Sequence, residues 1–169
     1  SRLYNIVAAA MDIHNSTAIN SVLTNIENDG LISPTSYIEM QKMISASFAK
    51  NYSYVSSLVI YFKENEETFY QSFYPVTNLE VDAWPEIKEG SYLLKWIGPS
   101  EDNPVIQNGI KHKGPSLCLY DKSRKGTEYV IVLDINALLL DDAVRNLYAN
   151  IADSVVVIDN NGIQSYGND

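Results

Sequence analysis

The chain has one cysteine, two histidines and few basic residues, and each shortage excludes a class of protein. Cys118 has no partner for an internal disulfide, and because it lies between Leu117 and Leu119 we expect a buried apolar side chain rather than a reactive thiol. Twelve Lys and Arg stand against 21 Asp and Glu, which gives a net charge of −9. The cations are scattered, so the sequence offers no basic face to nucleic acid.

Enzyme signatures are also missing. His14 and His112 are far apart in the sequence, and neither accompanies the Ser, Asp or Cys pattern of a catalytic triad. They lack the spacing of metal ligands, and no glycine-rich phosphate-binding motif follows a strand. Asp141 and Asp142 fit the first turn of a helix, where carboxylates interact favourably with the helix dipole. We therefore expect a domain that is not an enzyme and that holds no metal or cofactor.

No apolar run approaches the roughly 20 residues that a membrane-spanning helix needs. The chain begins with Ser1 rather than Met and starts directly in a helical pattern, so we expect a domain excised from a longer protein whose membrane segments lie outside it. Hydrophobic residues make up 46% and charged residues 20%, as in ordinary globular domains. The sequence therefore predicts a packed fold.

Helical spacing dominates the first third of the chain. Apolar residues over 3–26 predict one long N-terminal helix, straight or kinked, that Gly30 ends. Ser33 and Pro34 fit the N-cap and first residue of a second helix that runs to about residue 51. Its expected buried stripe is Tyr37, Met40, Ile44 and Phe48.

Strand patterns follow. Segments 54–62 and 68–74 flank a charged turn and predict an antiparallel hairpin, and segments 115–121 and 127–135 predict a second. Between the hairpins lies a loop-rich stretch with short strands, of which "SYLLKWI" is the clearest. A helix is expected after Asn136, and then a hairpin around Asn161-Gly162, a pair that favours a type I′ turn. Hairpins with helices at the ends indicate an α+β fold with an antiparallel sheet, over one face of which the loop-rich stretch lies.

This order resembles the Cache domains, the PAS-like extracytoplasmic sensor domains of bacterial histidine kinases and related membrane receptors. The resemblance rests on "YSYVSSLVIYF", "YVIVLDIN" followed by "ALLLDDAVRNL", and "VVVIDNNGIQ". It implies a PAS-like sheet with a long N-terminal helix and helices on one face. It also implies a single sensor domain over 1–169, in which 154–169 is either its closing hairpin or the first hairpin of a second, membrane-proximal module. In the first case, segment 155–158 must pair with the main sheet.

Aromatic residues with polar tips gather around the hairpins and the loop-rich stretch, and they suit stacking and hydrogen bonding to a small polar ligand. They fit a sheet core equally well. The candidate ligand-binding aromatics are Tyr74, Trp84, Trp96 and Tyr120.

Two charged residues join the candidate site. The resemblance implies that Asp134, at the end of its strand, pairs with a ligand ammonium, although the position also fits the start of the following helix. In the family, amino-acid recognition also uses an Arg and a Trp-Tyr pair. This chain departs from that pattern, because it has Lys95 and Trp96 in "LLKWIGP".

The expected function is extracytoplasmic signal sensing for a membrane-anchored bacterial protein of a two-component system. A sugar, amino acid or organic acid, or a solute-binding protein, would bind over the sheet, and closure of the loop-rich layer would shift the N-terminal helix. The alternative is a PAS-like protein-interaction module that binds no ligand and forms a homodimer through its first helix.

Overall fold

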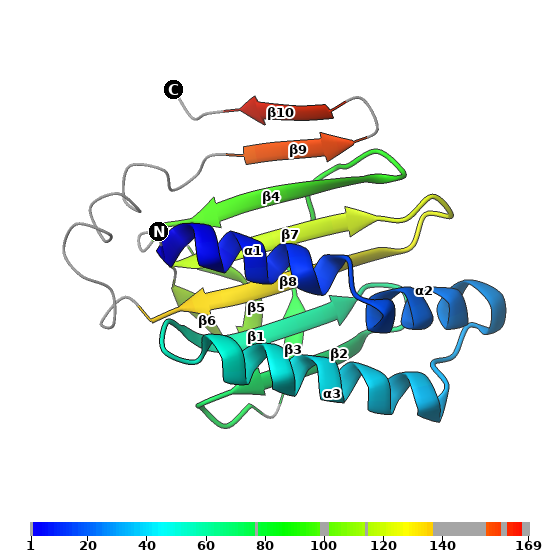
Figure 1. The fold of residues 1–169 in the computed structure, drawn as a ribbon, viewed down its shortest axis with the longest axis horizontal. Helices are drawn as coiled ribbons and strands as arrows, with labels where there is room; N and C mark the ends of the chain where they lie inside the picture. The colour runs from blue at the N-terminus through cyan, green and yellow to red at the C-terminus, as the bar shows by residue number, and fades with distance from the viewer. Residues whose placement is uncertain are drawn as a thin grey trace.

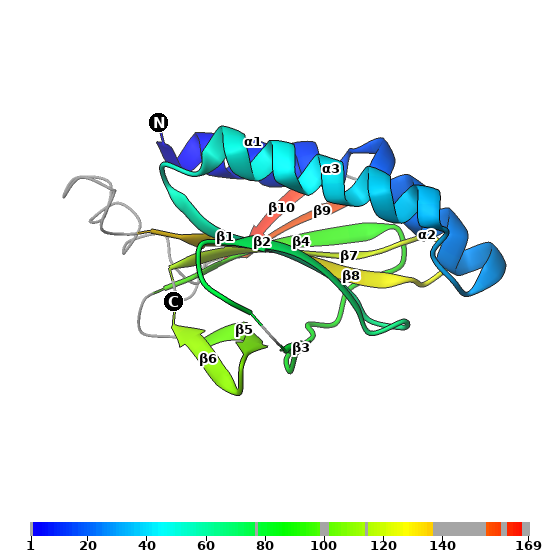
Figure 2. The same cartoon turned by 90° about the horizontal axis from the view of Figure 1, so that it is seen from below.

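The fold is a seven-stranded antiparallel sheet with helices on one face and a smaller sheet on the other (Figures 1 and 2). The computed structural model describes residues 2–76, 78–98, 102–113, 115–136, 155–159 and 162–166. Three helices lie in this part of the chain: α1 (Arg2–His14), α2 (Thr17–Asp29) and α3 (Pro34–Asn51). The mixed helix and antiparallel sheet confirms the α+β class.

The large sheet has the order β10-β9-β4-β7-β8-β1-β2, and the small sheet has the order β3-β5-β6. The strands are β1 (Val55–Phe62), β2 (Glu67–Ser72), β3 (Leu79–Val81), β4 (Ser91–Ile97), β5 (Asp102–Gln107), β6 (Ile110–Lys113), β7 (Ser116–Lys122), β8 (Glu128–Ile135), β9 (Val155–Asp159) and β10 (Gly162–Tyr166). Both predicted hairpins, β1–β2 and β7–β8, are present and antiparallel. The "SYLLKWI" strand is β4.

The predicted single N-terminal helix is instead two helices that meet at Asn15 and Ser16. Ser16 has extended backbone angles, and its side chain accepts a hydrogen bond from the Ile19 amide, so it caps α2. The apolar spacing continues across the break, which is why periodicity alone suggests one helix. Gly30 ends α2 in the left-handed conformation, with φ of 70°, as expected of a C-terminal glycine.

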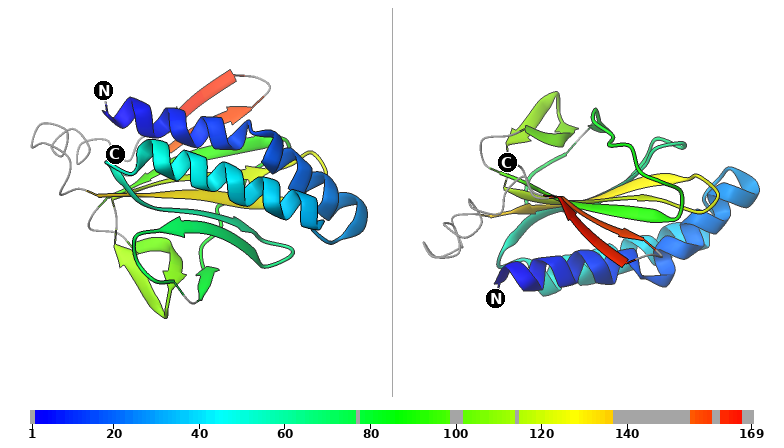
Figure 3. Two further views of the ribbon diagram at one scale, coloured as in Figure 1. Left: turned by 60° about the horizontal axis from the view of Figure 1, so that its bottom comes forward. Right: turned by 90° about the horizontal axis from the view of Figure 1, so that it is seen from above.

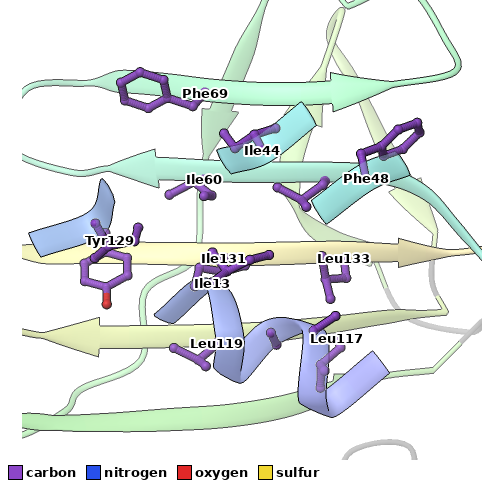
Figure 4. Packing of buried hydrophobic residues seen from close by; sticks show 14 of the residues in the cluster. Ile13, Ile44, Phe48, Ile60, Phe69, Leu117, Leu119, Tyr129, Ile131 and Leu133 are labelled. Atoms are coloured by element: carbon purple, nitrogen blue, oxygen red, sulfur yellow. The ribbon is translucent and has the colours of Figure 1, made fainter. Parts of the chain in front are cut away.

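The helices cover an apolar core on one face of the large sheet, and α1 and α3 run alongside each other above it (Figures 3 and 4). As predicted, α3 begins after the N-cap Ser33, and Met40, Ile44 and Phe48 are buried. The sheet meets them with alternate side chains, because successive strand residues point to opposite faces. Its core members on this face include Ile60, Phe69, Leu117, Leu119, Tyr129, Ile131 and Leu133.

The opposite face of the sheet is buried as well. Here Val59, Cys118, Val130 and Val132 pack beneath Val105 of the small sheet. The segment expected to be loop-rich therefore does lie over one face of the sheet, and much of it is β3, β5 and β6. Burial on both faces explains why the predicted central strand β8 is a nearly continuous apolar run.

The C-terminal hairpin extends the large sheet. Strand β9 pairs antiparallel with β4, from Tyr92 opposite Ile158 to Lys95 opposite Val155, and β10 pairs with β9. A hairpin that closes a single domain requires this pairing of β9 with the main sheet. The assignment of residues 1–169 to a single sensor domain remains a prediction. Asn161, the helix expected after Asn136, and Asp141 and Asp142 within it lie outside the described residues. Within the described ranges, no helix combines the length and apolarity needed to cross a membrane.

Candidate functional site

A buried carboxylate joins the two sheets. Asp134 of β8 is 2% exposed, and its Oδ1 accepts hydrogen bonds from Asn103 Nδ2 at 2.5 Å and from Ser116 Oγ at 2.6 Å. Asn103 of β5 is fully buried, and its own Oδ1 accepts from the Val105 amide at 2.8 Å. The Asn103 side chain thus ties the small sheet to the large one.

Burial raises the pKa of the Asp134 carboxyl. The charge of His112 on β6 lowers it in part, as do the Ser116 hydroxyl and the Asn103 amide. The Ser57 hydroxyl, opposite Asp134 on β1, also lowers this pKa. The hydroxyls of Ser57 and Ser116, the Asn103 amide and the His112 side chain therefore offset part of the effect of burial on the pKa of Asp134.

This environment gives the stability of the domain a pH dependence of defined sign. A carboxyl whose pKa is raised on folding stabilises the folded state below the unfolded pKa of about 3.9, and this contribution is lost as the pH rises through the folded pKa. In urea unfolding from pH 4 upwards, Asp134→Asn is therefore expected to gain stability relative to the wild type. An unchanged difference between the two proteins at every pH would contradict the account.

A second feature, on the face of the large sheet that the small sheet covers, is a pocket of about 470 Å³ beside Trp84. The indole is half-buried, and its ring centre lies 5.9 Å from that of Tyr120 and 6.1 Å from that of Tyr61. The pocket is lined by Lys63, Trp84, Pro85, Glu86, Ile87, Lys88, Lys122 and Glu128. The segment before β4 thus forms one wall, and the ends of β7 and β8 form another.

The charges around the pocket are unevenly paired. Lys63 Nζ donates to Glu128 Oε2 at 2.9 Å and lies 5.1 Å from the centre of the Trp84 ring. Lys122 lies opposite Glu128 in the β7–β8 register, yet neither it nor Lys88 forms an ion pair with any described residue. Two of the three lysines at the pocket therefore form no close ion pair among the described residues, although Glu86 and Glu128 line the same pocket.

Asp134 and the pocket beside Trp84 lie at separate places on the same face of the large sheet. Glu128 and Asp134 are six positions apart along β8, which at about 3.3 Å per residue is roughly 20 Å. A small solute cannot touch both. The Asp134 cluster holds the two sheets together, whereas the pocket beside Trp84 has room for a ligand.

The predicted site residues are only partly brought together. Trp84 and Tyr120 are in contact, and Lys95 and Asp134 lie further along the same face. Lys95 is opposite Cys118, and its charge partly offsets the burial that raises the pKa of that thiol. Cys118 is fully buried, as predicted.

The other two predicted residues lie elsewhere. Trp96 is buried in the core on the helix face, on the far side of the sheet from Trp84. Tyr74 follows β2 and is 63% exposed. The six residues predicted from the sequence therefore do not form one site.

Sequence reasoning missed the lysines of the pocket. Lys63 and Lys122 each stand beside a polar turn, where a charged residue is ordinarily solvated. They come together because β1 and β7 both pair with β8, so that Lys63 and Lys122 both lie next to Glu128. The strand register brings these lysines together, and a correct prediction of that register would have been needed to identify them.

His14 has a structural partner on the helix face. Its Nε2 lies 2.5 Å from Asp121 Oδ2 of β7, and its ring centre is 4.3 Å from that of Tyr92 on β4. Asp121 also accepts a hydrogen bond from Tyr129, and burial, followed by the Asp121 charge, raises the pKa of that phenol. The C-terminal end of α1 is thereby fastened to the middle of the sheet.

Among the described residues, no group of three or more His, Cys, Asp or Glu side chains is arranged to hold a metal ion. Comparison with protein families, with curated proteins and with solved structures finds no match to this chain. The argument for function therefore rests on the geometry of the site.

Proposed function

We propose that the chain is a PAS-like, extracytoplasmic sensor domain of a membrane-anchored bacterial signalling protein, and that it binds a small polar solute beside Trp84. The observation that carries this proposal is the pocket of about 470 Å³, in which Trp84 lies near Lys88 and Lys122, two cations without an ion-pair partner among the described residues. An aromatic surface beside polar groups that can orient a ligand is one feature of small-molecule sites, and Trp84 is the aromatic residue of this otherwise largely charged lining. The α+β class is compatible with such a domain, and the Cache resemblance of the sequence motivates the rest of the proposal.

The pocket has a short physical route to α1. Lys88 is four residues from Tyr92 in the chain, and the Gly90 amide donates to the Lys122 carbonyl at 2.7 Å, which holds this segment against β7. The Tyr92 ring lies against His14 at the end of α1 in a tilted contact, with the ring centres 4.3 Å apart. A solute that bridges Lys88 and Lys122 would favour one position of this segment and, through Tyr92, one position of α1.

Thermal unfolding against a panel of sugars, amino acids and organic acids tests this proposal. A ligand at 100 times its dissociation constant adds about 2.7 kcal/mol to the free energy of unfolding, which for a domain of this size raises Tm by roughly 5–10 °C. Trp84→Ala is expected to abolish the shift. The proposal is wrong if no solute raises Tm at millimolar concentration, or if Trp84→Ala responds as the wild type does.

The helical layer favours a second candidate, a ligand-free dimerisation module. A groove of about 420 Å³ runs between α1 and α3, and its lining includes Ala8 and Ala46. Tyr4 on α1 is 71% exposed and Ile38 on α3 is 57% exposed. Sedimentation velocity over a hundredfold range of protein concentration distinguishes the candidates. A dimerisation module is expected to associate as its concentration rises, without added solute. A solute-binding domain does not need to associate.

A further inference from the structure

The pocket beside Trp84 combines three kinds of chemistry within one small volume. It has ammonium groups from Lys63, Lys88 and Lys122, carboxylates from Glu86 and Glu128, and the Trp84 indole. The cations come from three separate segments: the end of β1, the segment before β4, and the end of β7. No local run of basic sequence creates this arrangement, so it is a product of the fold.

The cations point to an anionic ligand. The chain has twelve Lys and Arg in all and a net charge of −9, yet three of its lysines line this pocket against two glutamates. Glu128 is engaged by Lys63, and Glu86 is exposed at the rim. Lys122 is half-buried and Lys88 is exposed, so an anion that reaches both would meet one cation in partly screened surroundings and one in open solvent.

The remaining groups point to a hydroxylated ring. Carboxylates such as Glu86 accept hydrogen bonds, and hydroxyl groups donate them. An indole offers a flat apolar surface for the C–H face of a sugar ring, and Trp84 is held in place by Tyr61, Tyr120 and Lys63. A simple inorganic anion would contact the lysines alone, whereas a hydroxylated ring that carries an anionic group could also contact Glu86 and the open face of the indole.

We propose that the ligand of this pocket is an acidic monosaccharide, that is, a sugar that carries a carboxylate or a phosphate. Its anionic group lies between Lys88 and Lys122, its hydroxyls donate to Glu86 and Glu128, and its ring lies against Trp84. This inference rests on the proposed function, because it names the class of solute that the same pocket binds.

Isothermal titration calorimetry with four probes tests this assignment: glucuronate, glucose 6-phosphate, glucose and inorganic phosphate. We expect at least one acidic sugar to bind ten times more tightly than glucose and phosphate. The glucuronate and glucose 6-phosphate titrations separate a carboxylate from a phosphate ligand. Affinity is expected to fall as salt rises, because the ion pairs are partly exposed.

Lysine variants locate the anionic group. Lys88→Gln and Lys122→Gln are each expected to weaken binding of the acidic sugar about tenfold, because each removes a charge-assisted hydrogen bond worth roughly 1.4 kcal/mol or more. Lys42→Gln is the matched control, because it makes the same change of charge on α3, on the other face of the sheet. Its affinity should equal that of the wild type.

Three results would overturn the inference. If neither acidic sugar binds at 10 mM, or if Lys42→Gln weakens binding as much as Lys122→Gln does, the pocket is not an acidic-sugar site. Binding of glucose as tight as that of glucuronate, with loss of binding in Trp84→Ala, would also overturn it. In that last case a solute still binds beside Trp84, so the proposed function stands while the ligand class fails.

Discussion

Replacing Asn103 with alanine is expected to lower the free energy of unfolding by about 2–4 kcal/mol. The substitution removes a donor to the Asp134 carboxylate and to the Ser116 hydroxyl, and both acceptors stay buried. A buried polar group that loses its hydrogen-bond partner keeps its desolvation cost without compensation, and this cost is larger than the net value of an ordinary hydrogen bond. Urea unfolding followed by circular dichroism measures the loss.

A double-mutant cycle separates this interaction from general damage. If Asn103 acts through Asp134, the double variant Asn103→Ala with Asp134→Ala should lose less stability than the two single variants together, by about 1 kcal/mol or more. Additive losses would show that Asn103 does not stabilise the carboxylate. Such a result would remove the link between the two sheets from the account.

The largest loss is expected for Phe69→Ala, at about 3–5 kcal/mol. Phe69 of β2 is fully buried, and its ring centre lies 4.8 Å from that of Tyr37 on α3 and 6.1 Å from that of Phe62 on β1. Removing the ring leaves a cavity where the helix layer meets the edge of the sheet. Chemical denaturation should show a lower midpoint and an unchanged slope, as expected for lost packing in a two-state transition.

Phe73→Ala is the matched control. Phe73 follows the same strand and packs edge-on against Phe48 at 5.0 Å, but 57% of its surface is exposed. Because the ring is mostly in solvent, its loss should cost below about 1 kcal/mol. Equal losses for Phe69→Ala and Phe73→Ala would mean that the β2 edge is not packed as described.

Local patterns predict the elements of this fold well. The N-cap pair Ser33 and Pro34, the apolar stripe of α3 and the "SYLLKWI" strand each depend on residues close in sequence, and the structure confirms all three. The break between α1 and α2 was missed for the opposite reason. The apolar spacing passes through Asn15 and Ser16, so the capping side chain is the sole local sign of the break.

The site was less predictable because it depends on which strands are neighbours in the sheet and on which face of the sheet each side chain lies. The sequence identifies Trp84 and Tyr120 as aromatic candidates, but it does not show that Trp96 lies on the other face of the sheet. That outcome follows from the one-residue alternation of β4, which places Trp96 toward the helices and Lys95 toward the small sheet. Asn103, from a segment expected to be mostly loop, could not be paired with Asp134 without the three-dimensional fold.

The central claim, that a solute binds beside Trp84, has a direct spectroscopic test. The chain has two tryptophans, and they lie on opposite faces of the sheet, with Trp84 at the pocket and Trp96 only 6% exposed in the helix-face core. Each panel solute is titrated against Trp96→Phe, which reports Trp84 alone, and against Trp84→Phe, which reports Trp96 alone. We expect a saturable change of emission in Trp96→Phe and a constant emission in Trp84→Phe. A change confined to Trp84→Phe, or no change in Trp96→Phe with any solute, would contradict the claim.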